Sequence, residues 1–417
     1  MSKNAIQIIF LFYFASKTRN VNFILFDDER YANFLPLTYT RPVAEMRCGI
    51  LTIQEKWEHI VGIKLHYKTM DYLQEKFPFQ TTADNVFINS GLFPSKSLTE
   101  AILNLKSGDC LIKENTLLAA RMNEESAKQF DIANTVLNAH NIIFQDDIMV
   151  LNNLWDIFSL NDRAIRDDFQ RLTQGRTSQP ISSTNQVIGD QLFIEEGAKV
   201  ECSMINTSTG PVYIGRDAEI MEGCMVRGPF ALGSHAVLKM GAKVYGATTL
   251  GEGCKVGGEV NNVVFFANSS KAHDGFVGNA VIGEWCNIGA DSNNSNLKNN
   301  YEEVKLWSES KNSFVKTGLQ FCGLIMGDHS KCGINTMFNT GTVVGVSCNI
   351  YGAGFPRNFV PSFSWGSAAG FTEYQINKAA NTAARVFARR NLEFDAAELR
   401  LFQKVYLLTA EQRAMYS

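Results

Sequence analysis

The sequence lacks an excess of charge of either sign. Lys and Arg number 39 against 42 Asp and Glu, which leaves a formal net charge of −3 and a pI near 6.1. A protein that binds the phosphate backbone of nucleic acid needs a basic face. Nucleic acid is therefore not expected as the main partner.

Long apolar runs and paired cysteines are absent as well. No stretch reaches the roughly 18 apolar residues that suggest a membrane-spanning helix, so no membrane span is expected. The 9 cysteines are an odd number without short-spaced pairs, which argues against a disulfide scaffold or a zinc ribbon. Hydrophobic residues still make up 45%, enough for a sizeable core.

The first twenty residues differ in character from the rest of the chain. Residues 6–15 form an apolar run behind Lys3 that imitates a signal peptide, but no small-residue cleavage site comes after it. The opening strand of an α/β domain is expected to begin at Val21. Residues 1–20 are therefore interpreted as an extension or a mis-assigned start, with an export signal or a structured appendage as alternatives.

Residues 21–180 mix short β-type runs with amphipathic helical stretches. This alternation predicts a three-layer α/β domain. A polar segment rich in Ser and Thr, residues 177–185, is interpreted as a linker. The expected strands are 22–26, 86–89 and 142–150, and the expected helices are 50–58 and 164–172.

From Val187 the sequence takes up a period of six. An aliphatic residue stands at every sixth position, Gly often follows it, and a small residue stands four positions later. This hexapeptide repeat predicts a left-handed parallel β-helix over residues 187–360, because aliphatic side chains fill its narrow interior and small residues let the backbone turn each corner. The unbroken series is Ile214, Ile220, Val226, Leu232, Leu238, Val244, Leu250 and Val256.

Four cysteines fall in the small-residue slot of this repeat: Cys224, Cys254, Cys286 and Cys348. They are interpreted as small apolar fillers rather than ligands or bridges. Free thiols fit a reducing, cytoplasmic setting.

After the repeat ends, apolar residues return to helical spacing. Helices are expected at 372–390 and 396–415, within a helical tail of residues 361–417. This tail is interpreted as a cap on the open end of the solenoid or a cover for a neighbouring subunit.

Two local motifs resemble a known family. Residues 35–42 (LPLTYTRP) resemble the tail of the signature G-x-G-T-R-L-x-P-L-T-x-x-x-P-K, and residues 270–290 resemble S-K-A-G-H…G…I-G…N-I-G-A-G. Both motifs occur in the bifunctional N-acetylglucosamine-1-phosphate uridylyltransferase/glucosamine-1-phosphate acetyltransferase family. The resemblance runs from Val21 to about Pro361 and implies a divergent branch with a shortened N-terminal domain.

For acetyl transfer, the resemblance implies that His273 is the general base, since imidazole accepts a proton near neutral pH. A solvated surface histidine is the alternative. Lys271 is implied to orient or bind the substrate. Asn287 matches the family's sugar-contacting Asn, Asn296 matches an Asn near the acetyl group, and Lys298 stands in for a lysine just beyond it.

Two departures leave the acetyl acceptor open. The Gly before the histidine is missing, and residues 263–266 (VVFF) stand where a Lys-Lys pair would be expected. Arg227 remains as a candidate phosphate contact. The Asn-rich run at 291–300 is interpreted as a polar surface insertion or as a loop that contacts sugar or coenzyme A.

The nucleotidyltransferase motif departs further from the family. Acidic residues replace the Gly-rich phosphate loop at 27–34, and Val43 stands in place of the signature lysine. Arg41 is the candidate catalytic charge. Asn161 and Asp162 resemble the V-N-N-R segment and are the candidate ligands of Mg²⁺. A purely structural Arg41, with Asp27 and Asp28 merely ending a strand, is the alternative.

The resemblance implies a homotrimeric, cytoplasmic sugar-phosphate nucleotidyltransferase joined to an amino-sugar-phosphate N-acetyltransferase in nucleotide-sugar biosynthesis for the cell envelope. The implied cosubstrates are acetyl-CoA and a nucleoside triphosphate, expected to be UTP, with Mg²⁺. Two alternatives stay open: an acetyltransferase with a degenerate N-terminal domain, and a non-catalytic trimeric scaffold that binds sugar nucleotides.

Overall fold

The computed structural model describes residues 20–416 and divides them into two compact units. The first unit contains the described residues up to Tyr31 together with residues 41–46 and 51–152. The second unit contains residues 32–40 and 47–50 and everything from Asn153 onward. The interpretation of the N-terminal extension falls on residues 1–19, outside the described part.

The first unit is built on a six-stranded mixed sheet in the order β2-β1-β3-β5-β4-β6. β1 pairs in parallel with β2 and β3, while β5 runs antiparallel to β3 and β4. Its central strands are buried on both faces, as strands with continuous apolar runs require. The strands are β1 (Asn22–Phe26), β2 (His66–Lys68), β3 (Asp84–Asn89), β4 (Asp109–Lys113), β5 (Thr116–Asn123) and β6 (His140–Ile143).

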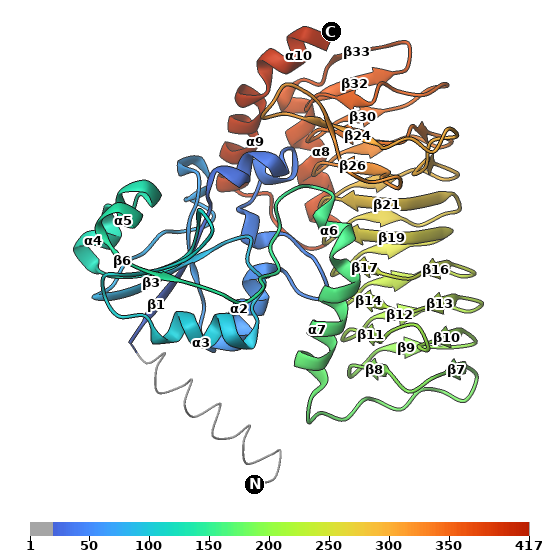
Figure 1. The fold of residues 1–417 in the computed structure, drawn as a ribbon. Helices are drawn as coiled ribbons and strands as arrows, with labels where there is room; N and C mark the ends of the chain where they lie inside the picture. The colour runs from blue at the N-terminus through green and yellow to red at the C-terminus, as the bar shows by residue number, and fades with distance from the viewer. Residues whose placement is uncertain (1–19, 417) are drawn as a thin grey trace. The chain divides into compact units, whose positions relative to one another are not determined.

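Helices cover both faces of this sheet, which confirms the predicted α/β class. Figure 1 shows α4 (Glu124–Lys128) and α5 (Ile132–Asn138) on one side and α3 (Lys96–Asn104) on the other. Between α4 and α5, Phe130 stacks on Phe87 of β3 with ring centroids 4.1 Å apart. The described residues also form four 3₁₀ turns: η1 (Glu29–Phe34), η2 (Leu37–Tyr39), η3 (Val43–Glu45) and η4 (Asp71–Leu73).

Two predicted boundaries in this part of the chain are wrong. The strand predicted at 142–150 ends at Ile143, and Val150 forms only an isolated bridge with Leu92. The helix predicted at 50–58 is α2 (Ile53–Val61), because Thr52 forms a capping box with Glu55 and fixes its start.

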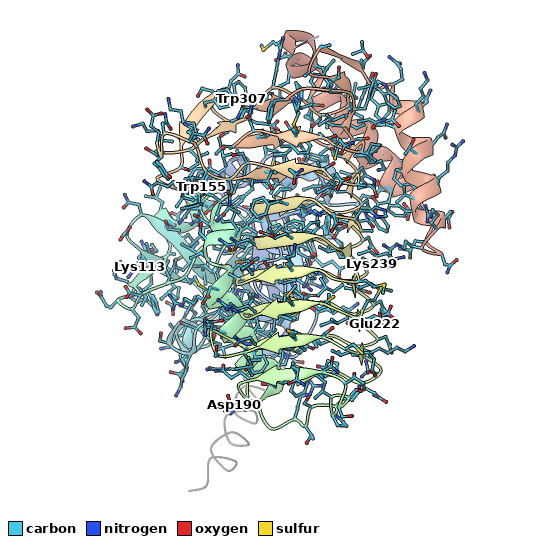
Figure 2. All side chains as sticks on the ribbon, turned by 90° about the vertical axis from the view of Figure 1, so that its right-hand side faces the viewer. Lys113, Trp155, Asp190, Glu222, Lys239 and Trp307 are labelled. Atoms are coloured by element: carbon cyan, nitrogen blue, oxygen red, sulfur yellow. The ribbon has the colours of Figure 1, made fainter. Side chains whose placement is uncertain are left out.

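The second unit is a parallel β-helix, which confirms the class predicted from the sixfold period. Its coils repeat after 18 residues, since Ile214 pairs with Leu232 and Leu232 with Leu250. The predicted aliphatic positions form one continuous buried core. Figure 2 shows the strands of successive coils lying one above another, from the coil of Asp190 toward Trp307.

The strands of this β-helix are short, as three-sided coils require. One sheet of the solenoid contains β7 (Gln186–Ile188), β8 (Leu192–Ile194), β10 (Met204–Asn206), β11 (Val212–Ile214), β13 (Met225–Arg227), β14 (Phe230–Leu232), β16 (Lys243–Tyr245), β17 (Thr248–Leu250), β19 (Glu259–Phe265), β21 (Phe276–Ile282), β26 (Leu324–Met326), β29 (Thr342–Val344) and β31 (Phe359–Val360). The other main sheet contains β9 (Lys199–Val200), β12 (Glu219–Ile220), β15 (Val237–Leu238), β18 (Lys255–Val256), β20 (Ser270–Lys271), β22 (Asn287–Ile288), β27 (Lys331–Cys332), β30 (Asn349–Ile350), β32 (Ser364–Ser367) and β33 (Gly370–Glu373).

The Asn-rich run begins as part of the β-helix rather than as a surface loop. Asn293 and Asn294 form β23 (Asn293–Asn294), which pairs with β28 (Met337–Phe338). The buried Asn294 side chain accepts the N–H of Gly278 at 2.9 Å and donates to its carbonyl at 3.0 Å. Its amide thus bonds to Gly278 in the way that a neighbouring backbone would. The next insertion carries the antiparallel hairpin of β24 (Lys305–Ser308) and β25 (Ser313–Lys316).

All nine cysteines are free thiols, and the four in the small-residue slot lie inside the β-helix core. Burial raises the pKa of the Cys254 and Cys348 thiols to about 12, so both stay protonated at neutral pH. The interpretation of these cysteines as small apolar fillers is confirmed.

Helices border the β-helix. α6 (Asp156–Ser159) and α7 (Asn161–Thr173) precede it, and α8 (Ile376–Ala388), α9 (Ala396–Leu408) and α10 (Ala410–Tyr416) come after it. The helix predicted from residue 372 begins later, because residues 370–373 pair with β32 instead. The second predicted tail helix is broken between α9 and α10. Among residues 20–416 no helix is long and apolar enough to cross a bilayer.

Candidate functional site

The carboxyl edge of the first unit's sheet gathers polar side chains from three strands. The chain leaves β1 toward β2 on one side, while β3 lies on the other side of β1. In open α/β sheets, such a switch point is the usual place for a ligand. Asp27 and Asp28 follow β1, Thr69 follows β2, and Asn89 ends β3.

Asp27 is held from two sides. Its carboxylate accepts the N–H of Val43 at 3.1 Å and the hydroxyl of Thr69 at 2.6 Å. Burial raises the pKa of this carboxyl to about 6, because desolvation outweighs the hydrogen bonds that favour the charged form. Asp27 therefore takes up or releases a proton close to neutral pH.

Asp28 is in the opposite state. Arg30 donates from Nε at 2.9 Å and forms an ion pair with the same carboxylate oxygen at 2.5 Å, and Asn89 donates at 2.8 Å. Burial pushes the pKa of Asp28 upward, but the hydrogen bonds and charge of Arg30 outweigh it and hold the pKa below its usual range. Arg30 also donates to Asn152 at 3.0 Å, which fixes its guanidinium.

Two adjacent carboxylates with different pKa values lie beside an arginine here, and they suit a phosphate that arrives with a bound cation, because carboxylates alone repel it. The surroundings of the two residues shift their pKa values in opposite directions, as is often found for pairs of catalytic carboxyl groups. In the sequence, these acidic residues stood out only as a departure from a phosphate loop. Their position directly after a buried parallel strand was the signal that could have identified this site.

Arg41 lies in the same unit, two residues before the Val43 N–H that binds Asp27. It is only 6% exposed. Of the predicted 35–42 motif, the last two residues, Arg41 and Pro42, therefore directly precede the backbone N–H that binds Asp27.

The predicted metal ligands Asn161 and Asp162 lie in different surroundings. The Asn161 oxygen accepts the N–H of Gly49 at 2.7 Å and the hydroxyl of Thr249 at 3.2 Å, and its nitrogen donates to the carbonyl of Ala247. Asp162 pairs instead with Arg166, one helical turn along α7, at 2.6 Å. The Asn161 amide is therefore taken up by partners within the second unit and does not fit a metal, whereas Asp162 keeps a partly exposed carboxylate and stays a prediction.

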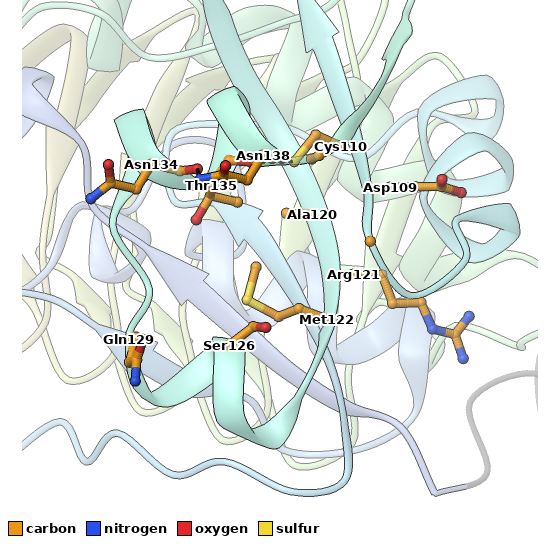
Figure 3. A pocket seen from close by; sticks show the side chains of 12 residues that line it. Asp109, Cys110, Ala120, Arg121, Met122, Ser126, Gln129, Asn134, Thr135 and Asn138 are labelled. Carbon is orange, nitrogen blue, oxygen red and sulfur yellow. Dashed lines mark hydrogen bonds between the residues drawn. The ribbon is translucent and has the colours of Figure 1, made fainter.

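A separate hollow of about 210 Å³ lies between β4, β5 and the helices α4 and α5 (Figure 3). Its charged groups are already engaged: Arg121 pairs with Asp84 at 2.5 Å, and Asp109 contacts His140 at 3.0 Å. This hollow offers no free charge for a phosphate or a metal.

The second unit places His273 on an exposed corner between β20 and β21. The corner is fixed from inside by Lys271, whose side chain is 0% exposed. The Lys271 ammonium donates to the carbonyls of Gly257 at 2.9 Å and His273 at 2.8 Å. Lys271 therefore positions the His273 backbone and is not accessible for the direct substrate contact that was one prediction for it.

The other predicted acetyl-site residues form two groups. Asn287 lies one coil above Ser270 and is exposed. Asn296 donates to the side chain of Asn279 at 2.8 Å, and Lys298 donates to the carbonyl of Glu303 at 3.0 Å. The last two stand at the entry to the inserted hairpin.

Arg227 does not join either group. It is exposed at the end of β13, in the column of residues that continues through Tyr245 and Asn261 to Gly278. Gly278 is thus three coils away, about 14 Å at the usual strand spacing. Arg227 was predicted to contact a phosphate and Asn296 to lie near the acetyl group, so the phosphate contact of Arg227 stays a prediction.

Residues 23–177 match a sequence-family model described as sugar nucleotidyl transferase. This segment is less than half of the chain. It includes the carboxyl edge with Asp27, Asp28 and Asn89. A comparison with curated protein sequences gives no match.

Three solved structures show faint likenesses to this chain. UDP-N-acetylglucosamine acyltransferase of Arabidopsis is 17% identical, with 56% of this chain and 94% of that chain covered and a TM-score of 0.22. The enzyme of the same name from Campylobacter jejuni is 16% identical, with 54% and 83% covered and a TM-score of 0.17. The polySia-specific acetyltransferase NeuO is 12% identical, with 49% and 100% covered and a TM-score of 0.22. Likenesses this weak support no assignment.

Proposed function

We propose that the chain is a sugar-phosphate nucleotidyltransferase whose active site lies at the carboxyl edge around Asp27 and Asp28. The observation that carries this proposal is the position of these two carboxylates, with Arg30 and Asn89, at the switch point of a sheet that lies in the matched segment. The reaction joins a sugar 1-phosphate to a nucleoside triphosphate, UTP in the first instance, and releases pyrophosphate.

Mg²⁺ is the metal that such a reaction uses. Among the described residues no three His, Cys, Asp or Glu are grouped to hold a metal on their own. Proteins commonly bind Mg²⁺ through one or two carboxylates and let substrate phosphates complete the shell. Asp27 would supply one carboxylate, and Asp28 would supply a second when Arg30 turns from it to the substrate phosphates. When bound, the metal would neutralise phosphate charge. Arg30 and Arg41 supply further positive charge in the same unit.

The second activity that we propose is acetyl-CoA-dependent acetylation of an amino-sugar phosphate at the His273 corner. His273 would accept the proton of the amine. Lys271 would position His273 by donating a hydrogen bond to the backbone carbonyl of His273. Together the two activities would form a bifunctional, homotrimeric enzyme of UDP-N-acetylglucosamine-type synthesis for the cell envelope. The free thiols fit a reducing cytoplasmic setting.

The first activity is tested by pyrophosphate release from UTP and N-acetylglucosamine 1-phosphate with Mg²⁺. Asp28→Asn is expected to lower kcat/KM at least 100-fold, as loss of a charged group at a reacting phosphate does. Asp71→Asn, an exposed aspartate of the same unit, is the control and should stay within twofold. Equal rates for wild type and Asp28→Asn would reject this site. No release with any triphosphate would favour a degenerate N-terminal unit.

The second activity is tested by thiol release from acetyl-CoA with glucosamine 1-phosphate. His273→Ala is expected to reduce the rate by 100-fold or more. His235→Asn, an exposed histidine on another coil corner, is the matched control and should leave the rate unchanged. If neither activity is found while sugar nucleotides bind, the scaffold alternative holds.

A further inference from the structure

A cavity of about 500 Å³ lies in the second unit between the β-helix and the C-terminal end of α8. Its volume is within the range of small-molecule sites, roughly 300–1,000 Å³. Four cationic side chains line it: Lys255, Lys331, Arg389 and Arg390. None of these four residues belongs to a motif that the sequence analysis linked to a function.

The strand register places two of these cations on one column of the β-helix. Lys255 pairs with Ser270, Ser270 with Asn287, and Asn287 with Lys331, each one coil above the last. At about 4.8 Å per coil, the two lysines bracket a hydroxyl and an amide over about 14 Å. All four side chains line the cavity.

The two arginines come from the other wall, immediately after α8. Phe387 of α8 stacks on Trp285 of the β-helix with ring centroids 4.1 Å apart. The His329 ring also stacks on Phe387, with ring centroids 6.0 Å apart, and contacts the Phe402 ring with centroids 5.0 Å apart. The end of α8 is therefore fixed against the coils, and Arg389 and Arg390 face the lysine column without a rearrangement of the helix.

The charge of this cavity is unbalanced. None of its described lining residues is acidic. Throughout residues 20–416, no ion pair involves Lys255, Lys331, Arg389 or Arg390, whereas Arg166 and Arg216 on the same unit are paired. Lys331 spends part of its donor capacity on the carbonyl of His329 at 2.8 Å, and this holds its ammonium at the wall.

Four cations around one small cavity repel one another in the absence of an anion. This repulsion disfavours the folded state, although the chain as a whole carries a net charge of −3. A ligand with several negative charges would relieve the repulsion. Arginine forks bind phosphate oxygens in pairs, and serine and asparagine supply further donors.

We propose that this cavity binds a small molecule with a diphosphate group, held between Arg389 and Arg390 on one wall and the Lys255–Lys331 column on the other. Coenzyme A and nucleotide sugars share this chemistry, so either could be the source of the diphosphate. Such binding requires neither of the two proposed activities.

Calorimetric titration of the full chain with coenzyme A, UDP-N-acetylglucosamine and inorganic pyrophosphate tests it. The double variant Arg389→Gln/Arg390→Gln is expected to weaken binding of the occupant at least tenfold. Arg385→Gln, an exposed arginine one turn earlier on α8 and outside the cavity, should change affinity less than twofold. Raising the salt concentration should weaken binding in the wild type more than in the double variant.

The three probes separate the sources. If the double variant weakens the binding of coenzyme A alone, coenzyme A is the source of the diphosphate. If it weakens the binding of UDP-N-acetylglucosamine alone, the source is a nucleotide sugar. If it weakens the binding of all three probes, the cavity recognises the diphosphate group itself. The proposal is overturned if no probe binds at about 1 mM, or if the double variant binds each probe as tightly as the wild type does. Lys255→Gln provides the same test should the double variant fail to fold.

Discussion

At the scale of single residues, Lys271 is the most unusual feature of the β-helix. It pairs with Val256 in a column of interior positions where, as far as Ile350, the other residues are aliphatic side chains and Cys332. Its ammonium is satisfied by two backbone carbonyls, yet desolvation lowers the pKa of Lys271 to about 8, against opposing attraction from Asp274 and Asp291. The sequence motif identified the position but could not show that the side chain points inward.

Lys271 makes stability depend on pH. Between pH 8 and 10.5 the unfolded chain binds the Lys271 proton and the folded chain releases it, so the contribution of Lys271 to stability rises with pH across this window. The buried Cys254 and Cys348 thiols contribute in the opposite direction, because the unfolded chain releases their protons first. The Lys271 contribution is up to about 3 kcal/mol. The stability of wild type relative to Lys271→Met is therefore expected to increase between pH 8 and 10.5, as measured by urea unfolding at several pH values. Relative to Lys243→Met, an exposed lysine on β16, wild type should show no such increase; a Lys271→Met curve parallel to wild type would show that Lys271 makes no such contribution.

At the scale of elements, the corner glycines set how closely coils stack. A Cβ on Gly233 would lie 2.6 Å from the nitrogen of Glu252 and 2.7 Å from the carbonyl carbon of Gly251 on the next coil. These are backbone atoms that cannot move without separating the coils. The sixfold pattern with Gly after the aliphatic residue therefore predicted the β-helix well, because it records this steric limit directly.

Gly233→Ala is expected to destabilise the second unit by about 1–3 kcal/mol, the usual effect of overpacking. Gly333→Ala is the matched control, since its nearest contact would be the side chain of Tyr351 at 3.6 Å. Its stability should stay within about 0.5 kcal/mol of wild type. Equal unfolding midpoints in urea for Gly233→Ala and wild type would show that the coils can separate at little cost.

The sites were less predictable than the coils, for physical reasons. Asn161 looked like a metal ligand in the sequence, but its amide is consumed by backbone groups from residues far away in the chain. The pKa contrast of the Asp27–Asp28 pair arises in the folded unit, where burial raises the pKa of Asp27 and the contact with Arg30, supported by Asn89 from a neighbouring strand, lowers that of Asp28. Such groupings depend on tertiary packing, which local spacing does not encode.

At the scale of the whole molecule, two units with different folding rules share one chain. The first depends on a mixed sheet, and the second on a solenoid in which each coil rests on the next. Neither is cross-linked, since all nine cysteines are free and eight are buried. The cysteine pattern in the sequence was sufficient to predict this.

Thermal unfolding should therefore be insensitive to reducing agents. Scanning fluorimetry with and without dithiothreitol is expected to give melting temperatures within about 1 °C of one another, because no covalent loop is opened. A fall of several degrees on reduction would reveal a cross-link. Treatment of the native protein with a thiol reagent should modify Cys202 first, the one exposed cysteine.

The hairpin inserted between β23 and β26 has a practical consequence. Ile282 and Met326 are neighbours on adjacent coils although a long segment separates them, and the next pairing, Met326 with Val344, is already regular again. A detour at one corner therefore leaves the stacking above and below it intact. The exposed tip at Lys311 and Asn312 is accordingly an attachment point where a reporter peptide or an affinity handle could be spliced into the chain without breaking the solenoid.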